Sequence, residues 1–399
     1  MPLHTQKKSV FSKAVIFVTV ISLCFQLVAA GTVIRATDTG DHTDAVLSVA
    51  SPLSVSARSA ILIEAQSGQV VWEKNADEIL PMASTTKIMT ALVAIENSNL
   101  EKTVEVSSDA VGIEGSSVYL YENERLSMED LLYAMLLESA NDAAAAIAIE
   151  VGGDIDSFAD MMNKKAVELG LENTHFENPH GLDGDEHYTT ARELGIIAAE
   201  AMKNPGFRTI VSTFKKTIPL NETEGVRLRI NHTKMLKGYD GAVGVKTGYT
   251  KKSGRCLVSA AQRDGVELIC VTLNAPDDWA DHKKMLDYGF SKFESRTLCK
   301  EDDFLYIQPV VGGMEEYVML KIDGDITVTV PRGCGDIDQT IELFRFSYAP
   351  IKKGDVMGRI VYTLDGEVIS ETPILASYSV DRIRYKKSLW DRITSAFAK

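Results

Sequence analysis

Three short motifs carry residue types that could perform covalent chemistry on a carbonyl group. The first is Ser84-Thr85-Thr86-Lys87, expected at the start of a helix, where residues i and i+3 share one face. The Lys87 amine could then reach the Ser84 hydroxyl and, if buried beside another cation, take its proton. The helix N-terminus would also direct backbone N–H groups at an oxyanion. The spacing alone is weak evidence, because Ser212-x-x-Lys215 repeats it and a capped helix followed by a solvated lysine is the plainer interpretation.

The second motif is Ser139-Ala140-Asn141, just after a helix expected to begin at Ser127. A hydroxyl and an amide two residues apart could line a cleft, relay a proton and hold a substrate carbonyl. Tyr121-Glu122-Asn123 is a rival of similar form, but it lies closer to Ser84 than expected.

The third motif is Lys246-Thr247-Gly248, which follows the apolar run 242–245 and is expected at the end of that strand. A lysine and a threonine at a strand end can bind a carboxylate, and the glycine lets substrate backbone approach closely. Lys252-Ser253-Gly254 has the same form but is expected in a turn.

The order of the three motifs matches a known signature. S-x-x-K, S-D-N and K-T-G mark class A β-lactamases and penicillin-binding proteins. The chain resembles that superfamily and, more narrowly, the serine-type D-alanyl-D-alanine carboxypeptidases among the low-molecular-mass penicillin-binding proteins. The resemblance runs from about residue 56 to 294, and its densest matches are Pro81–Thr90, Ser139–Ala143, Asn178–Leu182 and Gly244–Gly248.

The resemblance implies a role for each motif residue. Ser84 would be the acylated nucleophile and Lys87 its general base. Ser139 would relay a proton and Asn141 would contact the substrate. Lys246, Thr247 and Gly248 would bind the substrate at its terminal carboxylate, and the backbone N–H groups of Ser84 and Tyr249 would form the oxyanion hole. Tyr249 departs from the best-known members, which carry histidine after K-T-G.

The elements that must position these residues are predicted from periodicity and capping signals. A hairpin is expected over 59–63 and 70–74, helices from Ser84, from Ser127-x-x-Asp130, over 154–169 and over 191–203, strands over 241–245, 256–261 and 266–273, and a helix over 280–290. This order predicts an α+β domain over residues 55–296, with an antiparallel sheet flanked by helices and a helical subdomain, as in the β-lactamase/transpeptidase fold. Short β segments at 317–322, 326–330 and 360–364 predict a second, all-β domain over 303–380.

Composition and the two ends of the chain indicate its compartment. The 399 residues are 45% hydrophobic and 25% charged, which is typical of a globular protein, and the net charge of −14 argues against a nucleic-acid partner. Residues 1–30 hold lysines, an apolar run and no acid, which predicts a secretory signal peptide, with an uncleaved anchor as the alternative. Residues 31–54 are expected to be a linker.

Residues 381–399 hold six basic residues and two acids, beside a helical stripe of Leu389, Trp390, Ile393 and Phe397. An amphipathic helix of this kind would lie in a membrane interface, although it could instead dock on its own domain. We therefore expect an exported protein, held peripherally at the outer face of the bacterial cytoplasmic membrane.

Metals, disulfides and cofactors have little support in the sequence. Four cysteines follow the signal peptide, and whether Cys256 and Cys270, on neighbouring strands, form a disulfide is open, as it is for Cys299 and Cys334. His175, His180 and His187 are not spaced like metal ligands on one helix, and a Ser–Lys site needs no histidine. His180 is therefore interpreted as a structural turn residue, with no metal or cofactor expected.

The leading hypothesis is an enzyme that removes the terminal D-Ala from peptidoglycan stem pentapeptides through an acyl-enzyme on Ser84, with β-lactams as inhibitors. A class A β-lactamase is a rival, but its Glu-x-x-Leu-Asn element is missing, since Glu168–Glu172 ends in glutamate. Two further rivals stay open: a D,D-endopeptidase or transpeptidase on the same site, and an idle penicillin- or wall-binding module.

Overall fold

The computed structural model describes residues 53–220 and 225–384. The expected signal peptide over 1–30, nearly all of the linker over 31–54 and the apolar stripe of the expected C-terminal helix lie outside the described residues. Residues 55–292 and the β-rich residues 293–384 are described separately below.

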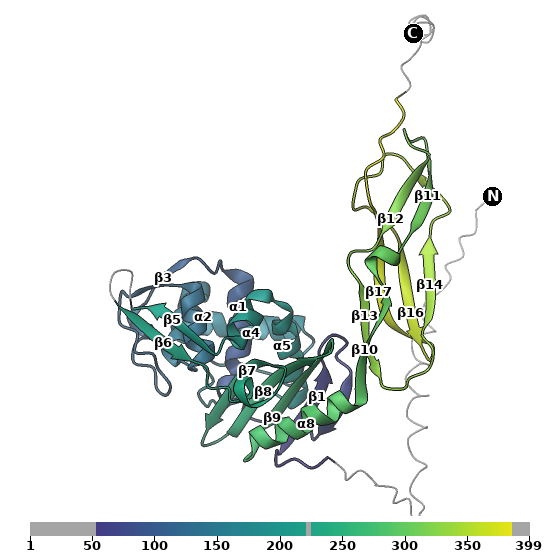
Figure 1. The fold of residues 1–399 in the computed structure, drawn as a ribbon. Helices are drawn as coiled ribbons and strands as arrows, with labels where there is room; N and C mark the ends of the chain where they lie inside the picture. Colours follow the sequence, from purple (N-terminus) through teal and green to yellow (C-terminus); the bar gives the residue numbers. More distant parts are fainter. Residues whose placement is uncertain (1–52, 221–224, 385–399) are drawn as a thin grey trace, which may run out of the picture. The chain divides into compact units, whose positions relative to one another are not determined.

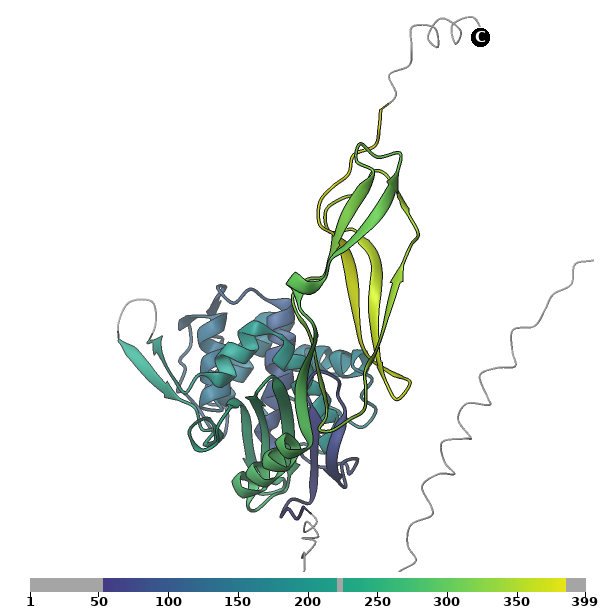
Figure 2. The ribbon, with the colours of Figure 1, turned by 45° about the vertical axis from the view of Figure 1, so that its right-hand side comes forward.

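A five-stranded antiparallel sheet is the centre of residues 55–292 (Figures 1 and 2). Its strands, in spatial order, are β2 (Val70–Lys74), β1 (Ser59–Glu64), β9 (Val266–Leu273), β8 (Gly254–Arg263) and β7 (Ala242–Thr250). All six residues of β1 are buried, because layers of helix cover both faces of the sheet. Strand β1 pairs with β9, so the first and last segments of this part share one sheet.

Helices cover the two faces of the sheet differently. On one face, α8 (Asp278–Lys292) packs through Met285 and Leu286 against Leu62 and Leu268. On the other face, Gly195 of α5 (Ala191–Lys203) lies close to the side chains of β1 and β9, so the helix approaches the sheet closely.

A helical subdomain adjoins that second face. It contains the 3-10 turn η2 (Ala83–Thr86), α1 (Lys87–Asn97), α2 (Met128–Leu137), α3 (Asn141–Gly152), α4 (Ile155–Glu168) and α6 (Pro205–Ser212). Short elements complete it: β3 (Thr103–Glu105) pairs with β4 (Arg125–Ser127), β5 (Lys215–Pro219) pairs with β6 (Val226–Ile230), and η3 covers Ser108–Ala110. The short helix α7 (Met235–Gly238) lies against β7, and its Met235 packs in the same core as Met285 of α8. The first eight residues of α3 are buried, and five of them are alanine, so neighbouring helices pack closely around it.

Capping signals located α2 and α5 correctly. Ser127 and Thr190 each accept a hydrogen bond from the backbone N–H three residues on, at the starts of α2 and α5. One helix was not expected and one expectation was wrong. Helix α5 ends at Lys203 as expected, but Pro205 begins a further helix, α6, with Asn204 as its cap. Strand β7 continues to Thr250, so Lys246–Gly248 lie inside the strand and not at its end.

Residues 293–384 are β-rich, as expected. Strand β10 (Phe293–Cys299) pairs with β13 (Ile326–Pro331). A short 3-10 turn, η4 (Glu301–Asp303), follows β10 in the chain. A six-stranded sheet follows the order β14 (Asp338–Leu343), β16 (Val356–Leu364), β17 (Glu367–Ala376), β12 (Tyr317–Lys321), β11 (Tyr306–Val311) and β15 (Ser347–Tyr348). Because β10 pairs with β13, residues 293–299 belong to this β-rich part, and the expected limit at 296 falls inside a strand.

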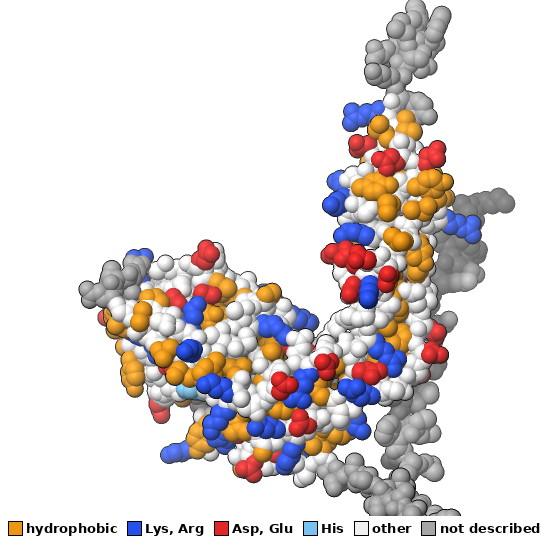
Figure 3. Space-filling view, viewed as in Figure 1, with side chains coloured by type: hydrophobic (Ala, Val, Ile, Leu, Met, Phe, Trp, Pro, Cys, Tyr) orange, Lys and Arg blue, Asp and Glu red, His pale blue; other side chains and the backbone are white. Residues whose placement is uncertain are grey.

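The β-rich part has a core and an apolar surface of its own. Val318, Leu320, Ile360 and Ile374 are buried between its strands. Hydrophobic side chains also gather on its surface in Figure 3, and the exposed ones in this part include Ile307, Met319, Phe344, Tyr348 and Val356.

The four described cysteines, Cys256, Cys270, Cys299 and Cys334, are free thiols. Cys270 lies opposite Ser259 in the sheet, and Cys256 lies opposite Gly248, so the two cysteines on neighbouring strands are not register partners.

Candidate active site

Ser84 lies in the turn η2, directly before α1. The preceding residue, Ala83, has a φ of 48°, a left-handed conformation that is uncommon for a residue with a side chain and costs about 1–3 kcal/mol. Two hydroxyls hold the turn: Thr85 Oγ1 donates to Met82 O at 2.6 Å, and Thr86 Oγ1 donates to Ala83 O at 2.8 Å. The turn leaves Ser84 partly exposed while the three residues after it are buried.

Lys87 is fully buried, and its amine nitrogen lies among three oxygen atoms. Nζ is 2.9 Å from Ser84 Oγ and 2.7 Å from Asn141 Oδ1, and it also contacts His180 O. A neutral amine has two hydrogens and one lone pair. It can therefore donate to the amide and carbonyl oxygens while accepting the Ser84 hydroxyl proton.

The surroundings of Lys87 favour this neutral form. Burial lowers the pKa of Lys87 well below its usual value, and the nearby Lys246 cation lowers it further, whereas the Asp142 carboxylate raises it. The Ser84 hydroxyl therefore lies beside an amine that is able to accept its proton.

Asn141 is oriented by contacts on both ends of its amide. Its Nδ2 donates to Glu114 O at 2.5 Å, which leaves Oδ1 directed at Lys87. Its backbone N–H donates to Ser116 O at 2.7 Å. The next residue, Asp142, is buried and accepts hydrogen bonds from Ser117 Oγ and from the backbone N–H groups of Val118 and Leu120. Asp142 thus holds residues 117–120 in place, and Ser116, directly before them, accepts the backbone hydrogen bond of Asn141.

Strand β7 is the edge of the central sheet and brings the third motif to Ser84. A Cβ atom added to Gly248 would lie 3.1 Å from both Ser84 N and Met82 O, so a side chain here would crowd the backbone of the turn. Lys246 is 1% exposed, its Nζ donates to Thr247 O at 2.9 Å, and burial lowers its pKa to about 7.

One cavity of about 370 Å³ is lined by at least one predicted residue from each motif, whereas Lys87, Asn141 and Lys246 are buried and are not among its lining residues. Its lining includes Ser84, Ser139, Thr247, Gly248 and Tyr249, together with Ser116, His232, Lys234, Arg255, Asp278 and Trp279. Lys87 does not line the cavity, but its Nζ contacts Ser84 Oγ and Asn141 Oδ1. All three motifs therefore meet, although they are far apart in the sequence.

The competing motifs do not line this cavity. Ser212 and Lys215 are exposed at the end of α6 and the start of β5. Tyr121–Asn123 form an exposed turn, and Lys252 and Ser253 lie in the turn between β7 and β8, with Gly254 as the first residue of β8.

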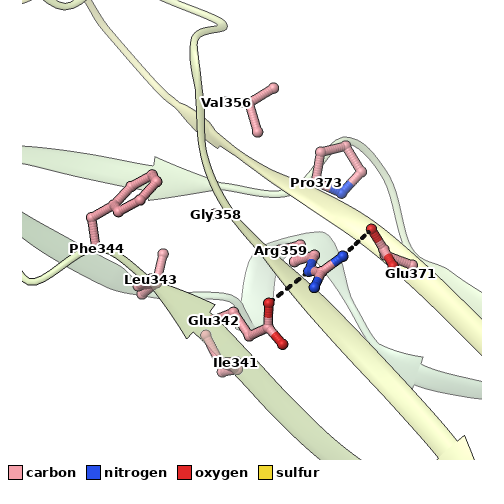
Figure 4. A pocket seen from close by; sticks show the side chains of 9 residues that line it. All are labelled: Ile341, Glu342, Leu343, Phe344, Val356, Gly358, Arg359, Glu371 and Pro373. Atoms are coloured by element: carbon pink, nitrogen blue, oxygen red, sulfur yellow. Dashed lines mark hydrogen bonds and ion pairs between the residues drawn. The ribbon is translucent and has the colours of Figure 1, made fainter. Parts of the chain in front are cut away.

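A larger cavity, of about 770 Å³, lies on the β-rich part (Figure 4). There Arg359 lies between two carboxylates, with Nε 2.6 Å from Glu342 Oε2 and Nη1 3.0 Å from Glu371 Oε1. The other lining residues are hydrophobic or glycine, among them Phe344, Val356 and Pro373. The described residues of this lining include no serine, cysteine, histidine or lysine, so they offer no nucleophile.

Sequence reasoning missed two contributions from the segment Asn178–Leu182. The carbonyl of His180 contacts Lys87. The ring Nδ1 of His180 accepts from Leu182 N, and burial lowers the pKa of this ring to about 3. Gly181 has a φ of 87°, and a Cβ atom there would lie 2.0 Å from Ala83 O. The identity of a side chain does not predict the contact of a backbone carbonyl or the close approach of Gly181 to Ala83. The presence of glycine at position 181 was the only indication in the sequence of that approach.

Metal ligation has no support in residues 53–220 and 225–384, where no group of three or more histidine, cysteine or acidic side chains is placed to hold an ion. The fold and the site together define a serine hydrolase in which a buried lysine lies beside the Ser84 hydroxyl.

Comparison with known proteins gives the family. The sequence profile of the D-alanyl-D-alanine carboxypeptidases matches residues 46–277, and that of the penicillin-binding protein 5 C-terminal domain matches residues 293–382. The chain belongs to the D-alanyl-D-alanine carboxypeptidase family. This confirms the predicted family, the α+β fold with a β-rich C-terminal part, and the class of serine peptidase.

Relatives are similar over most of their length. The D-alanyl-D-alanine carboxypeptidase DacF of Bacillus subtilis is 34% identical over 336 residues, which are 82% of this chain and 86% of the relative. DacC of Escherichia coli is 33% identical over 367 residues, covering 86% and 89%. Penicillin-binding protein 5 of Haemophilus influenzae has a similar structure, with a TM-score of 0.63, 29% identity and coverage of 83% of this chain and 99% of that one.

Replacing Gly181 by alanine tests whether the close approach of this segment holds the nucleophile. Gly170→Ala is a matched control, because its φ of 74° carries a similar backbone cost but a Cβ atom there meets nothing within 4 Å. We expect Gly170→Ala to lose about 1 kcal/mol of unfolding free energy and keep its reactivity. Gly181→Ala should react with a labelled penicillin at least about tenfold more slowly, because Ala83 and Ser84 must move. Equal rates for the two folded variants would contradict this account.

Proposed function

We propose that Ser84 attacks the carbonyl carbon of the penultimate D-Ala in peptidoglycan stem pentapeptides and releases the terminal D-Ala. The observation that carries the proposal is the position of the Lys87 amine, 2.9 Å from Ser84 Oγ and buried. The Ser84 proton passes to Lys87 as the Oγ–carbon bond forms. The backbone N–H groups of Ser84 and Tyr249 stabilise the oxyanion; Gly248, which allows β7 to approach Ser84, supports this assignment.

The leaving amine needs a proton, and we assign Ser139 to relay it. The Ser139 hydroxyl gives its proton to the amine and regains one from the Lys87 ammonium, which returns Lys87 to its neutral form. Lys246 and Thr247 bind the terminal carboxylate of the substrate. The pKa of Lys246, lowered to about 7 in the free protein, rises when that carboxylate arrives, so the substrate itself brings the counter-charge. Asn141 already uses Oδ1 and one Nδ2 hydrogen, so it contacts the substrate through the other hydrogen. Water then attacks the acyl-enzyme and frees Ser84.

The cavity favours slow release of a β-lactam over rapid hydrolysis. Among the described lining residues the only carboxylate is Asp278, and it pairs with Arg255 at 2.9 Å. Glu168 and Glu172, the nearest match to the deacylating element of class A β-lactamases, are exposed and outside this lining. A D,D-transpeptidase of Streptomyces K15 has 34% identity and a TM-score of 0.57, covering 60% of this chain, which supports transfer to an amine only weakly.

Release of free D-alanine from a D-Ala-D-Ala pentapeptide tests the proposal. Ser84→Ala should lower the rate at least about a thousandfold, because it removes the hydroxyl that contacts Lys87. Ser212→Ala, in the second Ser-x-x-Lys sequence, is the matched control and should keep the full rate. Activity that survives in Ser84→Ala would overturn the assignment. Preferential formation of an amide with added amines would instead indicate a transpeptidase, and fast turnover of penicillin a β-lactamase.

We further propose that the protein is exported and bound peripherally to the membrane by residues 385–399. The support is the acid-free, lysine-flanked apolar run in residues 1–30 and the basic, apolar stripe in the C-terminal sequence. In the described residues no helix is both long and apolar enough to cross a bilayer. Residues 381–383 still hydrogen-bond to the β-rich part, through Met314 N to Asp381 O and Ile383 N to Gly312 O.

Sedimentation with vesicles containing anionic lipid tests the role of the C-terminal segment. The chain from residue 31 to 399 should bind, and binding should weaken as salt is added, because basic side chains supply part of the attraction. Removal of residues 385–399 should abolish binding and leave D-alanine release from a soluble peptide unchanged. Undiminished binding of the shortened protein would show that another surface holds the membrane.

A further inference from the structure

The connection between α2 and α3 carries Ser139 in a strained conformation. Ser139 has a φ of 64°, in the left-handed region that is unfavourable for a residue with a side chain. It is separated from α2 by Glu138 and from α3 by Ala140. Surrounding contacts must therefore keep this short connection in place.

Contacts from two directions hold the connection. On one side, the Glu138 carboxylate accepts from Arg229 Nη1 at 2.9 Å and from Ile230 N at 3.3 Å. His232 N donates to Leu137 O at 3.0 Å, one residue earlier. On the other side, Asn141 N donates to Ser116 O. The residue that lines the cavity is thus flanked on both sides by anchored neighbours.

The ion pair between Glu138 and Arg229 is well shielded from water. The Arg229 side chain is 9% exposed and that of Glu138 is 23% exposed. Removing one partner of such a pair leaves the other charge with little solvation, so the remaining side chain is expected to move away. Any such movement of Glu138 is transmitted to Ser139 through one peptide bond.

Strand β6 provides a natural comparison within the same protein. Its residues alternate, with Val226, Leu228 and Ile230 exposed and the arginines directed inward. Arg227, two residues before Arg229, pairs with the buried carboxylate of Glu124 at 2.7 Å. Both ion pairs join an arginine of β6 to a carboxylate. Only in the Glu138–Arg229 pair is the carboxylate residue next to a residue that lines the cavity, Ser139.

We propose that Glu138 and Arg229 are positioning residues, whose ion pair fixes Ser139 for the transfer of a proton to the leaving amine. The proposal rests on the role of Ser139 proposed above. Its consequence depends on the leaving group. Cleavage of a peptide bond expels an amine that must be protonated as the carbon–nitrogen bond breaks, whereas a thioester expels a thiolate that needs no proton at neutral pH.

The test compares a D-Ala-D-Ala peptide with a thioester of the same acyl group, in Arg229→Gln and in the isosteric Glu138→Gln. For the peptide, we expect kcat/KM to fall about 10- to 100-fold, mainly through kcat. For the thioester, it should change less than about threefold. Arg229→Lys, which keeps the charge, should recover part of the peptide activity. Arg227→Gln is the matched control and should affect the two substrates equally.

Three outcomes decide the proposal. A loss confined to the peptide supports it, whether it is seen in Arg229→Gln or, if that variant does not fold, in Glu138→Gln. Equal losses for both substrates, or no loss, overturn it. Ser139→Ala distinguishes this failure from failure of the proposed function: if Ser139→Ala also lacks the difference between substrates, then the assigned role of Ser139 is wrong.

Discussion

The rest of the site depends on the contacts of one buried amine, that of Lys87. Three oxygens surround it, and they come from three separate segments: Ser84 in η2, Asn141 at the start of α3 and the carbonyl of His180. A charged amine would be costly at this depth. The neutral form matches the contacts, because its two hydrogens face two acceptors, Asn141 Oδ1 and His180 O, and its lone pair faces the Ser84 hydroxyl. Each contact has support of its own, from Glu114 O behind Asn141 and from the close packing of Gly181 on Ala83 behind the carbonyl.

A second buried amine explains why the site needs its substrate. Lys246 lies close enough to lower the pKa of Lys87, and burial lowers its own pKa to about 7. Two cations in one shielded site repel each other, so the free protein favours the loss of a proton. In the function proposed above, a substrate that carries a carboxylate lets Lys246 be charged while Lys87 remains the base. On that proposal, the same pair of lysines links recognition of a C-terminal carboxylate to activation of Ser84.

The sequence indicated the residues of the site better than their supports. Spacing placed Lys87 one turn from Ser84, and side-chain caps located α2 and α5, because these are local effects. The pairing of Glu138 with Arg229 joins residues 91 apart, and the carbonyl of His180 acts through backbone, so neither has a local signature. Strand β7 extends past Lys246 because β8 pairs with it as far as Thr250, which the turn residues around Gly254 did not reveal. These features depend on contacts between residues far apart in the sequence, which local propensity does not predict.

The most direct test is the rate at which a labelled penicillin attaches to the protein as pH is varied, with the adduct located by mass spectrometry. Attack requires neutral Lys87, and carboxylate binding favours charged Lys246, whose pKa is about 7. The account predicts an adduct on Ser84 and a second-order rate constant that is greatest near neutral pH and declines on the alkaline side. An adduct on another residue would contradict it. So would a rate that keeps rising toward pH 10.5, the usual pKa of a lysine.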